Sequence, residues 1–236
     1  MFCDLYQIYH KTIIKNYIFA LFQSAIGTLI IAIAFMTIEP TVSFALVTSA
    51  TSQFTVSQTV GKEIGFATLA TNVTMSPVLG GITGGTSNGI VSVAVRTNDL
   101  SGYSMTIQAS TSLGMQGVAS SSNYIAQYTP ASPTVPDYNF RTDINGFGYN
   151  VNASTTTDVP LPFRYTGSAC NTGSTVDSLH CWFPATSSAY TIINRNTITP
   201  TTGATTTLSF MVNLIPNNML PNDTYVATTT LTATVN

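Results

Sequence analysis

Apolar side chains fall on every second residue in two neighbouring stretches of the chain. The first set is Val91, Val93 and Val95, and the second is Tyr103, Met105, Ile107 and Ala109. Because side chains of a strand alternate between its two faces, the pattern predicts two half-buried antiparallel strands. Residues 98–102 between them are rich in turn formers, and Gly102 supplies a left-handed backbone angle without steric cost. We therefore expect a β-hairpin that covers a core.

The end of the chain repeats this pattern. One apolar set consists of Leu208, Phe210, Val212 and Leu214, and a second set in register consists of Tyr225, Ala227, Thr229, Leu231, Ala233 and Val235. The intervening sequence NNMLPND is typical of a turn. Threonine, abundant here, is favoured in strands because its branched side chain fits a pleated surface. A closing hairpin is expected.

Weaker strand signals lie elsewhere, and turn residues separate them. Strands are expected at 53–60, 66–76, 147–151 and 181–185, a glycine-rich loop at 77–89, and a long irregular excursion at 110–145. The sequence after residue 45 lacks a convincing helical apolar period. The pattern predicts an all-β protein, an antiparallel β-sandwich of Ig-like or jelly-roll-like type, in a single domain at 53–236.

The N-terminal region has the order of an export signal. Lys11 and Lys15 precede an uncharged run at 16–38, and small residues follow at Ser43 and Ala45. A basic start, an apolar middle and a small-residue exit predict a signal peptide at 1–45, cut between Ala45 and Leu46, with a linker at 46–52. The alternative is a retained hydrophobic helix that anchors the protein in the membrane, because about 20 apolar residues span a bilayer.

Charge is scarce in this sequence. Only 7% of the 236 residues are charged and the formal net charge is −2, against roughly 25% charged residues in an ordinary soluble domain. Nothing in such a chain neutralises a run of phosphates, so nucleic acid is excluded as a partner. Uncharged polar β-structure of this kind is typical of proteins at the cell surface or outside the cell.

Two cysteines follow the N-terminal run. Cys170 and Cys181 lie inside CNTGSTVDSLHC, and in an oxidising compartment such a pair closes a short loop as a disulfide. The alternatives are free thiols or a metal site that adds His180. Two thiolates and one imidazole leave a zinc shell incomplete, and the spacing matches no zinc pattern.

Three segments together resemble a known group of proteins. They are VSVAVRTNDLSGYSMTIQAS at 91–110, FGYNV at 147–151 and the closing stretch at 205–236. Their order resembles that of poorly characterised bacterial cell-surface β-sandwich proteins, and the closing stretch is similar to those of WxL-type surface proteins and some pilin-like subunits. This chain has Phe147 where that group usually has Trp, and PNDTY at 221–225 where glycine is expected. The resemblance implies a surface β-sandwich and provides no catalytic residues.

Catalytic and metal-binding patterns are weak. His180 with nearby Asp177 is the one candidate for a Ser–His–Asp arrangement of a secreted hydrolase, and a loop histidine is the simpler interpretation. Asp137, Asp143 and Asn145 offer oxygen ligands for Ca²⁺, without the spacing of a known calcium loop. We expect a non-enzyme without a cofactor.

Aromatic residues are the candidate ligand contacts. Trp182, Tyr124, Tyr128 and Tyr138 lie in the excursion and beside the cysteine loop. Exposed aromatic rings stack on sugars and on protein partners, although Trp182 is also placed to cover the disulfide. The sequence thus predicts an exported structural or adhesive surface protein that self-associates or contacts surface glycans or other surface proteins. The alternative is a carbohydrate-binding module, and a hydrolase ranks third.

Overall fold

The computed structural model describes residue 49 and residues 51–236 of the chain. The expected hydrophobic helix, the cleavage site between Ala45 and Leu46 and most of the expected linker lie outside the described residues. Residues Thr59–Asn236 form one compact unit. Within the described residues, no helix is both long and apolar enough to cross a membrane.

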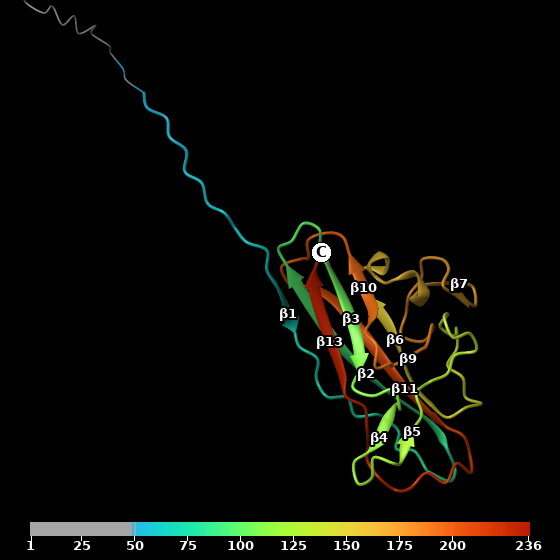
Figure 1. The fold of residues 1–236 in the computed structure, drawn as a ribbon. Coiled ribbons are helices and arrows are strands. Elements are labelled where there is room, and N and C mark those ends of the chain that lie inside the picture. The colour runs from blue at the N-terminus through green and yellow to red at the C-terminus, as the bar shows by residue number, and fades with distance from the viewer. Residues whose placement is uncertain (1–48, 50) are drawn as a thin grey trace, which may run out of the picture. The chain divides into compact units, whose positions relative to one another are not determined.

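Two antiparallel sheets build the core of this unit (Figure 1). The first sheet contains, in spatial order, β1 (Ile64–Thr68), β2 (Gly85–Thr97), β11 (Ala204–Leu214), β6 (Gly146–Ala153) and β9 (Phe183–Pro184). The second contains β10 (Tyr190–Arg195), β3 (Tyr103–Ala109) and β13 (Thr229–Val235). The prediction of a nearly all-β, sandwich-like fold is therefore confirmed.

Short elements surround the two sheets. A small sheet contains β12 (Tyr225–Val226), β4 (Met115–Gly117) and β5 (Tyr124–Ile125), while β7 (Tyr165–Thr166) pairs with β8 (Ala169–Cys170). Two single-turn 3₁₀ helices, η1 (Thr156–Asp158) and η2 (Leu161–Phe163), follow β6 directly. The region expected as a long excursion at 110–145 is largely irregular apart from β4 and β5.

The first expected hairpin forms both of its strands but not their pairing. β2 pairs with β1 and β11, whereas β3 pairs with β10 and β13, so the chain crosses from one sheet to the other between Thr97 and Tyr103. The Gly102 amide donates to the Asp99 carbonyl at 3.1 Å, and Gly102 has a φ of +77°. The turn chemistry was predicted correctly, and the hairpin was wrong because alternation reports which face is buried rather than which strand lies alongside.

The closing pair behaves in the same way. β11 lies between β2 and β6 in the first sheet, while β13 pairs with β3 in the second. The strand expected at 225–235 is interrupted after β12, and its larger part is β13. Both expected hairpins are therefore crossovers that join the two sheets.

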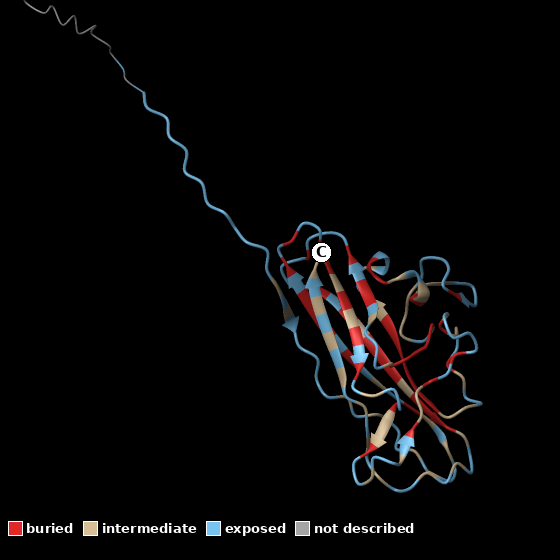
Figure 2. Cartoon of the chain, viewed as in Figure 1, coloured by how far each residue is buried: buried red, intermediate tan, exposed pale blue. Residues whose placement is uncertain are grey.

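The alternating apolar residues meet between the sheets. Buried positions follow the central strands in Figure 2, and Val95, Tyr103, Met105 and Leu208 are each at most 1% exposed. Full burial of one such aliphatic side chain contributes about 1.5–3 kcal/mol. The faces assigned from the sequence to β2, β3 and β11 are confirmed.

Three local predictions were wrong. The strand expected at 66–76 ends at Thr68, the last residue of β1. Residues 53–60 form no strand, and Phe54, Val56 and Val60 are 83%, 83% and 81% exposed. The expected loop at 77–89 already enters β2 at Gly85. Gly89 lies inside β2. The residue is a glycine because Val73 packs so close to its backbone that a Cβ would collide with the Val73 side chain. Glycine there allows close packing instead of a turn.

Candidate functional site

The cysteine loop is closed by the expected disulfide. Cys170, at the end of β8, is bonded to Cys181 with a Cα–Cα distance of 5.7 Å. Both cysteines are buried. The two sulfurs are bonded to each other, which excludes their use as free thiols or as zinc ligands in this structure.

Asp177 organises the interior of this loop. Its Oδ1 accepts hydrogen bonds from the Leu179 and His180 amides at 2.8 and 2.9 Å, and its Oδ2 accepts the Tyr165 hydroxyl at 2.7 Å. Burial alone would raise the pKa of Asp177, but these donors and the His180 ring outweigh it and the pKa is lowered. The hydrogen bond that the Tyr165 hydroxyl donates to Asp177 raises the pKa of Tyr165 to about 12.

His180 pairs with the same carboxylate. Its Nδ1 lies 2.7 Å from Asp177 Oδ2, and its ring stacks on Tyr138 at a centroid distance of 4.1 Å. The Asp–His part of a hydrolase triad is thus present. In the described part of the chain, however, no serine, threonine or free cysteine hydrogen-bonds to His180, so the third member of such a triad is not seen beside the pair.

Two of the four candidate ligand-contact aromatics are buried. Trp182 and Tyr128 are each 1% exposed and pack with Phe140 into a second apolar cluster. The Trp182 indole N–H donates to the Leu179 carbonyl at 2.8 Å, and the Tyr128 hydroxyl donates to Asp137 at 2.6 Å. The expectation that they contact a ligand at the surface is corrected, because their polar atoms are satisfied internally.

The other two aromatics do not form a platform. Tyr124 on β5 is 47% exposed, and Tyr138 is half-buried against Tyr165 and His180. No ring contact joins Tyr124 to Tyr138 among the described residues. A line of stacked sugar rings along the four predicted aromatics therefore has no support in their placement.

The candidate calcium ligands are engaged in structural contacts. Asp137 accepts the Tyr128 hydroxyl and the Ala131 amide, and Asp143 forms an ion pair with Arg141 at 2.7 Å. Asn145 accepts the Ile215 amide at 2.7 Å. Over the described residues, no three His, Cys, Asp or Glu side chains gather as metal ligands.

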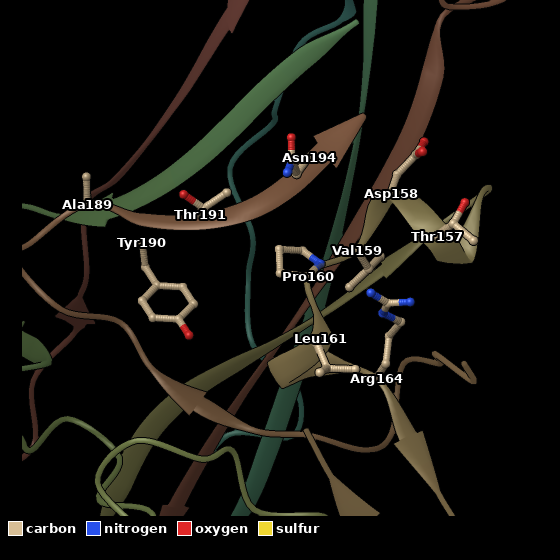
Figure 3. A pocket seen from close by; sticks show the side chains of 10 residues that line it. All are labelled: Thr157, Asp158, Val159, Pro160, Leu161, Arg164, Ala189, Tyr190, Thr191 and Asn194. Carbon is tan, nitrogen blue, oxygen red and sulfur yellow. The ribbon is translucent and has the colours of Figure 1, made fainter. Parts of the chain in front are cut away.

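An open surface pocket of about 570 Å³ lies beside η1, η2 and β10. Figure 3 shows its lining side chains, with Arg164 and Tyr190 on opposite sides of Pro160 and Leu161. The remaining lining residues are Thr157, Asp158, Val159, Ala189, Thr191 and Asn194. Pockets that bind small molecules commonly measure about 300–1,000 Å³, so the size suits a small ligand.

The two charged residues of the pocket differ in their partners. Asp158 accepts a hydrogen bond from Arg195 Nη1 at 2.6 Å, so its charge is neutralised within the protein. Arg164 has neither an ion-pair partner nor a side-chain hydrogen bond among the described residues, and its Nε is buried. A buried donor without an acceptor costs about 1–3 kcal/mol. The pocket therefore has one unpaired positive charge.

Tyr190 forms the aromatic part of the pocket. Its ring packs on Phe183 and Phe163 at centroid distances of 4.8 and 5.8 Å, and burial raises the pKa of its hydroxyl. The hydroxyl makes no hydrogen bond with any described residue. The ring position is fixed by packing while the hydroxyl stays available to a ligand.

Sequence reasoning did not find this pocket. Its lining comes from 157–164 and 189–194, two segments without a recognisable motif. A usable signal was the scarcity of charge, because Asp158, Arg164 and Arg195 are three of only sixteen charged Lys, Arg, Asp and Glu residues. In a chain with so few charges, each charged residue is a candidate for a specific contact.

Comparison with protein-family models, with curated proteins and with solved structures finds no match to this chain.

Proposed function

We propose that this protein is an exported, non-catalytic structural component of the cell surface that associates with copies of itself. The buried disulfide supports an oxidising compartment, and the uncharged, threonine-rich sheets suit an exposed scaffold. The observation that carries the proposal is a half-covered sheet edge in a chain that also exposes an apolar extended segment. The finer assignment of the fold as Ig-like or jelly-roll-like stays a prediction.

The sheet edge is β13. It pairs only with β3 among the described strands. The Ser110 amide bonds to the Thr228 carbonyl and the Asn236 amide to the Gly102 carbonyl. By antiparallel geometry, even-numbered residues of β13 bond to β3, while the backbone groups of Leu231 and Ala233 point away from β3. β1 lies near this side of β13, but no described strand pairs with it. Such an edge is a template for another strand.

The inward face of β13 is also incompletely covered. Leu231 and Ala233 pack on the core but are only half-buried, whereas Met105 and Ile107 on the neighbouring β3 are fully buried. An added strand with apolar residues at every second position would cover this face and satisfy the open backbone groups together.

The segment 53–60 fits this requirement. Phe54, Val56 and Val60 share one face of an extended chain, are more than 80% exposed, and belong to a stretch without charged residues. We propose that this segment of one copy adds as a strand along β13 of a second copy. Its alternation, which predicted a strand that does not form in the isolated chain, is then explained by an intermolecular pairing.

A pair of matched double variants tests the assembly. Phe54→Asp/Val56→Asp places two charges on the apolar face, and Thr55→Asp/Ser57→Asp places the same charges on the opposite face. The purified full chain is measured by size-exclusion chromatography with light scattering over a range of concentrations. We expect the first variant to be monomeric and the second to associate like the wild type. A strictly monomeric wild-type protein at high concentration would contradict the proposal.

Export is tested separately. Intact mass of the native protein, measured with and without reducing agent, should give a chain that starts at Leu46 and gains two daltons on reduction. A chain that retains residues 1–45 and fractionates with membranes would support the anchor instead. Carbohydrate binding is the second candidate function, and the specific observation in its favour is the pocket with unpaired Arg164.

A further inference from the structure

The cavity between η1, η2 and β10 lies at the opposite edge of the second sheet from β13. The sheet order is β10, β3 and β13, so β10 and β13 are its two outer strands. A ligand in the cavity therefore uses a different part of the molecule from the proposed self-association. The two proposals are independent, and each can fail without the other.

The charge of the cavity selects an anion. Asp158 and Arg164 are the charged residues in its lining. Asp158 is already paired with Arg195, whose guanidinium also donates to the carbonyls of Thr197 and Ile198. Arg164 is left as the uncompensated charge, and a guanidinium matches a carboxylate through two parallel hydrogen bonds.

Arg164 is held in place by the backbone around it. Its amide donates to the Leu161 carbonyl at 2.9 Å, which closes η2, and its carbonyl accepts the Thr172 amide at 3.2 Å. The preceding Phe163 is 1% exposed and anchors the turn in the core. The base of the side chain is thus fixed. Nε is buried without an acceptor, while the two terminal nitrogens of the guanidinium are neither buried nor paired with a described residue and are the donors that a ligand oxygen can reach.

The rest of the lining suits a sugar ring. Tyr190 presents a packed aromatic ring with an available hydroxyl, and Pro160 and Leu161 add apolar surface (Figure 3). Thr191 and Asn194 are exposed on β10, and their side chains hydrogen-bond to no described residue. Uncharged donors and acceptors beside an apolar surface match hydroxyl groups on a ring.

We propose that this pocket binds a carboxylate-bearing pyranose, an acidic sugar, through Arg164. The carboxylate accepts from the guanidinium, the ring lies against Tyr190 and Leu161, and the hydroxyls contact Thr191 and Asn194. A neutral sugar lacks the group that pairs Arg164, and a small free carboxylate lacks the ring contacts.

The test uses D-glucuronate, D-glucose and acetate as probes, each titrated into the full-length protein by NMR at constant ionic strength. We expect glucuronate to bind at least tenfold more tightly than either of the other two. Arg164→Gln should weaken glucuronate binding at least tenfold, and Arg164→Lys should restore only part of it because an ammonium lacks the planar fork. Arg96→Gln removes the same charge from an exposed position on β2 and should leave binding unchanged.

A second variant guards against an indirect effect of changing Arg164. Thr191→Glu adds a negative charge at an exposed position of the pocket wall and should also weaken glucuronate binding at least tenfold, with an unchanged melting temperature. Glucose binding as tight as glucuronate binding would overturn the role of Arg164, and equally tight acetate binding would overturn the sugar. An equal loss in Arg96→Gln would reduce the effect to overall charge and overturn the site.

Discussion

Arg195 Nη1 donates a hydrogen bond of 2.6 Å to Asp158 Oδ2, and the two side chains are only 11% and 8% exposed. This contact joins the end of β10 to η1 and so fixes two walls of the pocket. Arg195 also donates to the Thr197 carbonyl through Nε and to the Ile198 carbonyl through Nη2. The buried guanidinium is thereby satisfied on each of its three nitrogens.

Removing one member of this pair should be costly. Asp158→Ala leaves an uncompensated buried charge, which lowers the free energy of unfolding by about 3–5 kcal/mol. Urea unfolding followed by circular dichroism measures the change. The double variant Asp158→Leu/Arg195→Met should recover much of the loss because both charges disappear together. A loss below about 1 kcal/mol in Asp158→Ala would show that water reaches the pair.

The disulfide should stabilise the compact unit through its short loop. Cys170 and Cys181 are 11 residues apart in sequence, and closing a loop of this length in the unfolded chain corresponds to about 3 kcal/mol. Cys170→Ser/Cys181→Ser should lose that amount in chemical unfolding. Reduced wild-type protein is the control and should match the double variant. If the double variant and the reduced protein unfold at the same denaturant concentration as the oxidised protein, the disulfide contributes little to the free energy of unfolding.

Acid should weaken the same loop through Asp177. Its pKa is lowered in the folded protein, so its contribution is fully present above the unfolded value, about 3.9, and is lost as the pH falls through the folded value. Melting temperature is measured from pH 7 to pH 2. Asp177→Asn should be less stable than wild type at pH 7 and lose less stability on acidification. Parallel curves for the two proteins would refute this role.

Gly102 should tolerate no side chain. It has a φ of +77°, and a Cβ there would collide with the Arg195 carbonyl. Gly102→Val combines backbone strain of roughly 1–3 kcal/mol with that clash, so a clear drop in melting temperature is expected. Gly61→Val, at an exposed glycine with open space around it, is the control and should melt like the wild type.

The sequence correctly predicted which faces of the strands are buried, but not which strands pair with each other. Val93, Met105 and Leu208 are buried as their alternation indicated, because a period of two depends only on the strand itself. Which strand pairs with which depends on the path between the sheets. The turn near Gly102 serves a crossover here as well as it would serve a hairpin, so the residues of the turn could not distinguish the two.

In the candidate site, too, contacts within one short segment were predictable from the sequence, while contacts between distant segments were not. The Cys170–Cys181 bond was predictable because both partners lie in one short segment. For Trp182 the sequence left open both a surface contact and a position covering the disulfide, and its burial depends on Phe140, which comes from a distant part of the chain. The pocket around Arg164 was missed for the same reason, since η2 and β10 meet only in the folded protein. Composition could flag its charges but not bring them together.

The crossovers between the sheets also govern the order in which the protein can fold. Ser92 and Thr207 hydrogen-bond across β2 and β11 although 115 residues separate them, and β3 pairs with the distant β13, where Ala109 lies opposite Thr229. A topology with such a high contact order folds slowly, since distant loops must close before any sheet is complete. The second sheet cannot be completed until β13 joins β3, so its formation depends on segments that are far apart in the sequence. Under the export proposed above, this late closure would keep the chain unfolded while it crosses a membrane.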